Sequence, residues 1–113
     1  MIISRKALQA EKVNDKVERR IMAYDEQLML AEVHLQKGGV GALHAHPHHQ
    51  VDYVVKGSVL FELEGKRYAM EAGDSVVIPP NARHGATALE DSILLDIFSP
   101  MRGDFLKSDK KER

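Results

Sequence analysis

Apolar residues alternate with polar ones along several short stretches of the chain. Between residues 29 and 35 every second side chain is apolar, as expected of a β-strand with one buried face: Met29, Ala31, Val33 and Leu35. Similar stretches, separated by turn residues or ended by prolines, cover 51–57, 58–71, 74–80 and 92–100. None of them keeps the longer period that a helix requires. The pattern therefore predicts an all-β protein, either a sandwich or a barrel.

The two ends of the chain differ from this central region. Residues 17–106 are predicted to form a single β domain, because short strand-like segments follow one another without a low-complexity linker. Residues 1–16 are predicted to form an N-terminal arm, which is compatible with either a short helix or an extended segment. Residues 107–113, with the sequence KSDKKER, are expected to be a charged and disordered tail.

Composition narrows the partners and the chemistry. The 113 residues carry a formal net charge of −1, which argues against a nucleic acid or an anionic membrane surface as the partner. A small-molecule ligand is the remaining expectation. Cysteine is absent, so any metal ion must be bound by histidine and oxygen ligands. Charges appear early, at Arg5 and Lys6, and no apolar stretch approaches the length of a membrane span, so we expect a cytoplasmic protein.

The segment HAHPHHQVDYVVKG, residues 44–57, contains four of the six histidines of the chain. Residues two apart in a strand point to the same face, so His44 and His46 can direct both imidazoles at one metal ion. Gln50 lies an even number of residues further along and is therefore expected on the same face. His48 shares it too, but Pro47 interrupts the strand before it, and we expect His49 to point away. Both of these histidines are predicted to be rim or surface residues.

A third histidine, His84, follows the double proline of IPPNARHGA. Three imidazoles and one amide oxygen suit one divalent first-row transition metal ion, with positions left open for water or substrate. Nickel, zinc, iron, manganese and cobalt all remain possible identities. The alternative is that Gln50 hydrogen-bonds to the ligands without binding the metal itself.

Two motifs of the chain resemble those of the cupins. The first runs from Gly38 through the predicted ligands to Gly57, and the second runs from Gly73 through Pro79 to His84. This resemblance implies a cupin double-stranded β-helix, also called a jelly-roll barrel, in a single domain. The chain departs from the usual motifs with Asn81 in place of glycine, Ala88 in place of asparagine and Gln50 in place of glutamate.

The segments GALHAHPHHQ, RRIMAYDEQLMLAEV and IPPNARHGATALEDSILLDIFSPMRGDFL resemble the KdgF-type cupins, which are pectin and alginate degradation proteins. The resemblance implies that His44, His46, Gln50 and His84 bind the metal and that Asp96, Phe98 and Arg102 form the active site. It also implies the reaction, which converts 4,5-unsaturated monouronates to linear 4-deoxy-5-keto uronates. His49 replaces a frequent glutamate of this family, and VDY at 51–53 replaces the more usual IGY.

The three residues that the resemblance implies as the active site have chemistry that fits an anionic sugar. Asp96 is an acid in an apolar strand, where a lone charge is costly unless it is paired or transfers protons. Arg102 is suited to bind a carboxylate, although pairing with Asp104 is an equally open interpretation. Phe98 is a candidate surface for the sugar ring, with a place in the core as the alternative.

Other functions and the assembly also follow from the pattern. The same histidines suit an iron-dependent cupin dioxygenase, and a non-catalytic sugar- or metabolite-binding cupin is a further alternative. We also expect a homodimer, because the strands carry more apolar residues than the inner face of a small barrel can hold. Val51, Tyr53 and Val55 share one face, whereas the apolar Val54 lies on the other.

Overall fold

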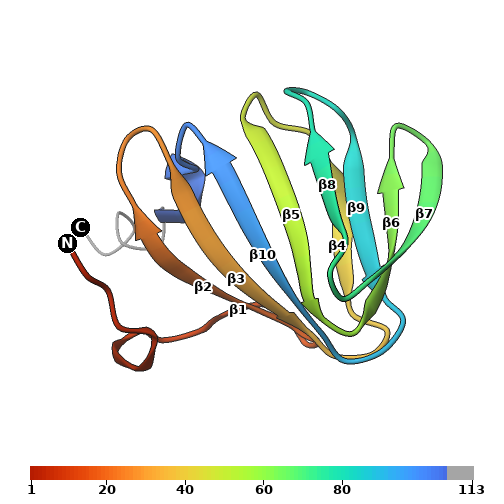
Figure 1. Ribbon diagram of the computed structural model, residues 1–113, viewed down its shortest axis with the longest axis horizontal. Helices are drawn as coiled ribbons and strands as arrows, with labels where there is room; N and C mark the ends of the chain where they lie inside the picture. The colour runs from red at the N-terminus through yellow and green to blue at the C-terminus, as the bar shows by residue number, and fades with distance from the viewer. Residues whose placement is uncertain (107–113) are drawn as a thin grey trace.

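Two antiparallel β-sheets face each other in the computed structural model, which describes residues 1–106 (Figure 1). The larger sheet contains, in spatial order, β1 (Glu11–Asn14), β2 (Val17–Tyr24), β3 (Met29–Leu35), β10 (Ser92–Ser99), β5 (His49–Lys56) and β8 (Ser75–Ile78). The smaller sheet contains β4 (Val40–His44), β9 (His84–Ala88), β6 (Ser58–Leu63) and β7 (Lys66–Glu71). Two short 3₁₀ turns, η1 (Arg5–Ala7) and η2 (Gly103–Leu106), flank the strands. The predicted all-β fold is confirmed.

The N-terminal region contains both a turn and a strand. Residues 1–16, for which a short helix and an extended arm were both open, include η1 and then β1. β1 pairs with β2, with Glu11 opposite Arg19, and a salt bridge of 2.7 Å joins these two side chains. β1 therefore forms the edge of the larger sheet. The tail expected at residues 107–113 lies outside the described residues.

Tight turns have backbone angles that explain their residues. Glu64 and Gly65 have φ values of 48° and 81° and join β6 to β7. Positive φ at both central residues is typical of the type I′ turn, which matches the twist of a hairpin. Asn81, which stands where cupin motifs usually carry glycine, has a φ of 67°. Asparagine is among the few residues that adopt this conformation readily.

The main apolar core lies between the two sheets. The larger sheet contributes Val54, Ile78 and Leu94, and the smaller sheet contributes Val59 and Phe61, all of them buried. Along β5 the inward-facing residues change character from one end of the strand to the other. Val54 belongs to this core, whereas Asp52 and Gln50 are buried polar residues that precede it on the same face. The core therefore fills one part of the barrel and leaves a polar site in another.

The outer face of the larger sheet is apolar and exposed. On β5 it presents Val51, Tyr53 and Val55, and on β8 it presents Val77, which pairs with Val51 in the ladder. Val77 is 68% exposed. Among the described residues, no helix is both long enough and apolar enough to span a membrane.

Candidate metal centre

Three histidines from different parts of the chain meet at one end of the barrel. His44 ends β4, His84 begins β9, and the two residues are directly paired in the ladder between these strands. His46 lies in the segment that leads from β4 into β5. One ring nitrogen from each histidine lies within 4.8 Å of those of the other two. The structure therefore brings together the three imidazoles that the sequence predicted as ligands.

The close approach of β4 and β9 depends on glycine. A Cβ atom added to Gly85, the residue after His84, would lie 2.8 Å from the carbonyl oxygen of Gly41 on β4. Real Cβ contacts are longer than this, so any other residue at 85 would push the two strands apart. Gly85 thus helps to bring His44 and His84 together, with their ring centroids 4.4 Å apart.

Backbone carbonyls set the orientation of two of the three rings. Nδ1 of His44 donates to the carbonyl of Ala42 at 2.8 Å, and Nδ1 of His84 donates to that of Ala82 at 2.9 Å. In both rings Nε2 is then the nitrogen with a free lone pair. The Nε2 atom of His84 is buried and has no hydrogen-bond partner. A buried acceptor without a partner is costly, and a metal ion would satisfy it.

His46 is linked to Gln50, the predicted fourth ligand. Nε2 of His46 donates to Oε1 of Gln50 at 2.8 Å, and both side chains are buried. Burial lowers the pKa of His46 to about 4 and also lowers the pKa of His84. These two rings are therefore neutral at physiological pH, as metal ligands must be.

The donor set fits a divalent transition metal ion. Imidazole nitrogens bind zinc, iron, nickel and copper well, and amide oxygens are acceptable partners. His48 and His49 lie outside the triad that meets here. His49 is exposed, as expected, and His48 is partly buried with its ring 5.2 Å from that of His46. The triad of His44, His46 and His84 is thus able to hold one metal ion.

Two carboxyl groups lie side by side next to Gln50. Asp96 on β10 is directly opposite Asp52 on β5, and their side chains are hydrogen-bonded to each other. Burial raises the pKa of Asp52 well above its usual value, and the carboxylate of Asp96 raises it further. Burial also raises the pKa of Asp96. The pair therefore retains a proton to higher pH than a single exposed carboxyl would.

Asp52 is a site residue that the sequence reasoning missed. Its signal was present, because an acid stands two residues before the buried Val54 and therefore on the inward-facing side of the strand. Asp52 has the same parity as Gln50 and is 5% exposed. From the sequence only Asp96 was predicted to be a functional acid. Periodicity within one strand does not reveal which residue lies opposite on the neighbouring strand.

Arg102 is paired rather than free. Its Nε and one terminal nitrogen donate to the two carboxylate oxygens of Asp104 at 2.8 and 2.6 Å. This is the pairing with Asp104 that the sequence left open. These hydrogen bonds lower the pKa of Asp104. The guanidinium also packs over the ring of Phe105, 4.2 Å from its centroid. Arg102 is 7% exposed, so its position is well determined by these contacts.

Phe98 lies at the boundary between core and site. It is buried with Met29 and Ala31 in a second apolar cluster, and its ring centroid is 5.8 Å from that of His46. Both interpretations of this residue, core and site surface, therefore describe part of its surroundings.

One cavity of about 330 Å³ joins these groups. Its volume is at the lower end of the range for small-molecule sites, which suits a ligand of monosaccharide size. The predicted site residues that line it are His44, Gln50, His84, Asp96, Phe98 and Arg102. Asp52 and Arg19 line it as well, and neither was predicted. Arg19 comes from β2 and its Nε atom is buried without a partner. Arg19 and Arg102 thus place two guanidinium groups on one side of the cavity, each paired with a carboxylate, Glu11 and Asp104 respectively.

Comparisons with known proteins agree with this geometry. A family model described as a cupin domain matches residues 31–98, which is more than half of the chain. The pectin degradation protein KdgF of Dickeya dadantii is 39% identical over 98 residues, which cover 85% of this chain and 89% of that protein.

Two solved structures are similar over nearly the whole chain. The structure of KdgF from Halomonas sp. has a TM-score of 0.89 and 37% identity, and covers 93% of this chain and 97% of its own. An RmlC-like cupin from Shewanella frigidimarina has a TM-score of 0.88 and 35% identity, with coverages of 92% and 94%. The chain therefore belongs to the cupin family, of which it is a KdgF-like member.

Proposed function

We propose that this protein converts 4,5-unsaturated monouronates, derived from pectin or alginate, to linear 4-deoxy-5-keto uronates. The observation that carries this proposal is one cavity that is lined by His44 and His84 of the histidine triad, by the carboxyl pair and by two arginines. The name of the Dickeya dadantii relative, a pectin degradation protein, supports the same substrate class. Overall the reaction is an isomerisation, so no redox cofactor is required.

The proposed cofactor is one divalent transition metal ion per chain, bound by His44, His46 and His84 with Gln50 as fourth ligand. When bound, the ion supplies a positive charge that neutral ligands do not offset, and this charge attracts and polarises an anionic substrate. A glutamate at position 50 would reduce that charge by one. The amide therefore suits an anionic substrate better than the more usual acid.

The substrate carboxylate is proposed to lie against the side of the cavity that carries the two arginines. Arg102 is held by Asp104 and by the ring of Phe105, so it presents its charge without first losing side-chain freedom. Arg19 adds a second positive charge from β2. Phe98 offers an apolar surface next to them. These groups orient the sugar so that its C4=C5 bond lies near Asp96.

Asp96 is proposed to transfer the proton. In the reaction the C1 hydroxyl loses its proton, and the bond between C1 and the ring oxygen breaks to leave an aldehyde. C4 gains a proton as the enol at C4=C5 becomes a ketone at C5, so protons move but no electrons are transferred. Asp96 lies in the cavity wall with Oδ1 unpartnered and with a raised pKa, so it can hold a proton for C4.

The test is the loss of the C4=C5 ultraviolet absorbance of a monouronate released by a polysaccharide lyase and a glycosidase. Metal-loaded protein should exceed the spontaneous decay, and the double variant His44→Ala, His46→Ala should not. Failure on both pectin- and alginate-derived substrates would refute the function and favour a binding role. Oxygen consumption that depends on added iron would instead identify a dioxygenase.

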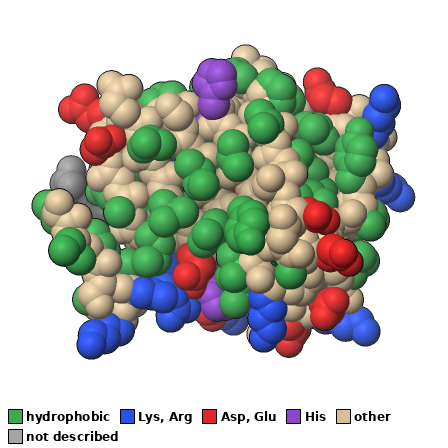
Figure 2. All heavy atoms as spheres, viewed as in Figure 1, with side chains coloured by type: hydrophobic (Ala, Val, Ile, Leu, Met, Phe, Trp, Pro, Cys, Tyr) green, Lys and Arg blue, Asp and Glu red, His purple; other side chains and the backbone are tan. Residues whose placement is uncertain are grey.

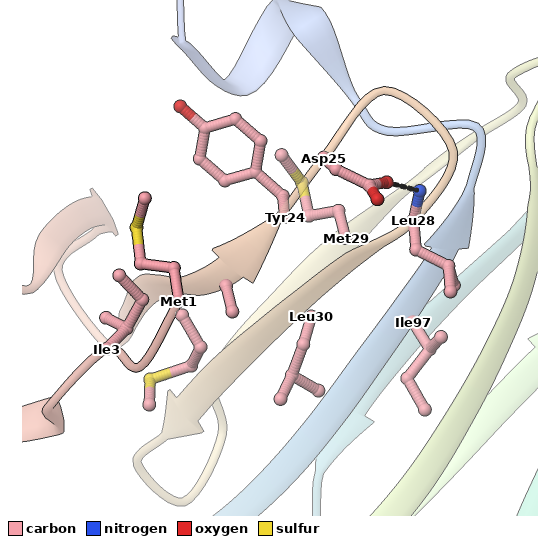
Figure 3. Close-up of a pocket in the computed structure, with 10 residues that line it drawn as sticks. Met1, Ile3, Tyr24, Asp25, Leu28, Met29, Leu30 and Ile97 are labelled. Carbon is pink, nitrogen blue, oxygen red and sulfur yellow. Dashed lines mark hydrogen bonds between the residues drawn. The ribbon is translucent and has the colours of Figure 1, made fainter.

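We also propose that two copies of the chain associate through the outer face of the larger sheet. Figure 2 shows hydrophobic side chains spread across the middle of the face where β10 and β5 lie in Figure 1. Beside them is an apolar groove of about 790 Å³. Figure 3 shows Tyr24, Leu28, Leu30 and Ile97 lining it, with Met1 and Ile3 of the N-terminal segment at its side. Exposed apolar surface of this extent is typical of subunit interfaces.

A further inference from the structure

The side chain of Asp52 lies between Gln50 and Asp96, and nothing in the proposed reaction requires it. Nε2 of Gln50 donates to Oδ1 of Asp52 at 2.7 Å. Both side chains are 5% exposed, so water does not compete for this hydrogen bond. Asp52 therefore contacts a predicted metal ligand directly while remaining outside the histidine triad.

The two ends of the Gln50 amide have different partners. The NH₂ group, which can only donate, faces Asp52, while the oxygen, which can only accept, faces Nε2 of His46 at 2.8 Å. A rotation of the amide by 180° would place the oxygen against the oxygen of Asp52 and the NH₂ group toward the histidines. The acceptor on Asp52 thus distinguishes the two orientations.

Asp52 is itself held in place. The ladder between β5 and β10 sets it directly opposite Asp96, to which its side chain is hydrogen-bonded. On the next inward-facing position of β5, Val54 is completely buried. The carboxylate of Asp52, which accepts the hydrogen bond from Gln50, is therefore held in a fixed position in the barrel wall.

We propose that Asp52 is a positioning residue that turns the amide oxygen of Gln50 toward the metal and makes a neutral amide the suitable ligand at position 50. A glutamate there would have no hydrogen to donate to Asp52. It would also place three carboxyl groups in succession, at 50, 52 and 96. With Asp52 in place, an amide at position 50 is therefore more favourable than a carboxylate.

The first experiment compares Asp52→Asn with Asp52→Val in Co²⁺ titrations of the metal-free protein. The asparagine oxygen can still accept from Gln50 while its NH₂ group donates to Asp96, so affinity should stay close to that of the wild type. Valine offers no acceptor, and Co²⁺ affinity should fall about 10- to 100-fold, the usual effect of losing a partner that orients a ligand. Equal Co²⁺ affinity in folded Asp52→Val and wild-type protein would overturn the proposal.

A second experiment does not depend on the valine variant. Gln50→Glu should lower the thermal midpoint of the metal-free protein, and the double variant Gln50→Glu, Asp52→Asn should recover most of that loss. The coupling between the two sites is what the proposal predicts. If Gln50→Glu costs the same with Asp52 as with asparagine at 52, the proposal is wrong.

Nuclear magnetic resonance of the Gln50 side-chain amide provides a local readout. Its protons should be protected from exchange in the wild type and in Asp52→Asn, and exposed in Asp52→Val. Because metal affinity, stability and amide exchange are all measured without a sugar, failure of the proposed reaction would leave these results unaffected. A wild-type protein that binds no Co²⁺ would remove the metal site and this inference with it.

Discussion

The two faces of β5 have opposite characters at the end of the strand that lies next to the metal centre. Facing inward are Gln50 and Asp52, both buried and polar, whereas the outward residues Val51 and Tyr53 are apolar and exposed. A strand in a monomeric sandwich usually shows the reverse, because apolar groups gain from burial and polar groups lose. Each face of β5 therefore carries residues whose position costs free energy in an isolated chain.

The difference shows where compensation is needed. The inner polar groups compensate one another, because Gln50 contacts both His46 and Asp52, and Asp52 contacts Asp96. A metal ion would satisfy the buried Nε2 atom of His84, which has no hydrogen-bond partner. Within residues 1–106 the outer apolar groups of β5 remain exposed, and the proposed second subunit would cover them. The proposed reaction thus concerns the inner face and the proposed dimer the outer face, and each can be changed separately.

The largest expected effect is on metal content. The double variant His44→Ala, His46→Ala removes two of the three imidazoles and should bind no metal, whereas wild-type protein should contain one divalent ion per chain. Elemental analysis of protein purified without added metal measures both. The outer face is unchanged in this variant, so its mass in solution should match that of the wild type. Equal metal content in the two proteins would contradict the assignment.

The second effect is on turnover. Asp96→Asn keeps the shape of the side chain but cannot transfer a proton, so turnover should fall by about 10²-fold or more. Metal content and thermal stability should remain near wild type. Asp74→Asn, at an exposed turn position, is a matched control that should retain full activity. A turnover unchanged by Asp96→Asn would remove the proposed proton-transfer role.

A third effect concerns substrate binding. Arg102→Ala should mainly raise KM, by about 10-fold or more, because a charge-assisted hydrogen bond to the substrate carboxylate is lost. Asp104→Asn keeps the arginine and should have the smaller effect on KM. Steady-state kinetics on both variants would separate the two. A change in kcat with KM unaltered would assign Arg102 to the chemical step instead.

A fourth prediction concerns disruption of the proposed interface on the outer face of the larger sheet. Val51→Lys with Val77→Lys places two charges on neighbouring, paired strands of the proposed interface. The mass measured by light scattering should fall from about twice the chain's 12.7 kDa to that of one chain, with metal content preserved. Val40→Lys on the smaller sheet, also at an exposed valine, should leave the dimer intact. A wild-type protein that is already monomeric would refute the proposed assembly.

The smallest expected effect is a pH dependence at the edge of the cavity. Arg102 holds the pKa of Asp104 below its ordinary value of 3.8, so the folded state loses this proton more readily than the unfolded state. The resulting stabilisation is complete above pH 3.8 and is lost as the pH falls through the lowered pKa. It should amount to about 1 kcal/mol or less, as for other exposed ion pairs. Urea unfolding of wild type and Asp104→Asn should therefore differ at neutral pH and converge in acid.

Much of the fold and part of the site were predictable because they depend on the spacing of residues that are close together in the sequence. The alternation at 29–35 corresponds to β3, and the stretch at 92–100, which ends at a proline, contains β10. The spacing of His44 and His46, with His84 after the double proline, was enough to predict the triad. The N-terminal segment was less predictable, since whether a short polar stretch becomes a strand depends on the edge that it meets, here β2.

The sequence by itself determined the strand pattern and the types of ligand, because parity along a strand and spacing within a motif are properties of neighbouring residues. Only the tertiary structure decided which of these groups act on each other. Asp52 and Asp96 are far apart in the chain and become partners through the register between β5 and β10. Arg102 had two possible roles by sequence, and the turn of η2 brings Asp104 against it. Pairing across strands depends on how the sheets are assembled, and no single segment contains that information.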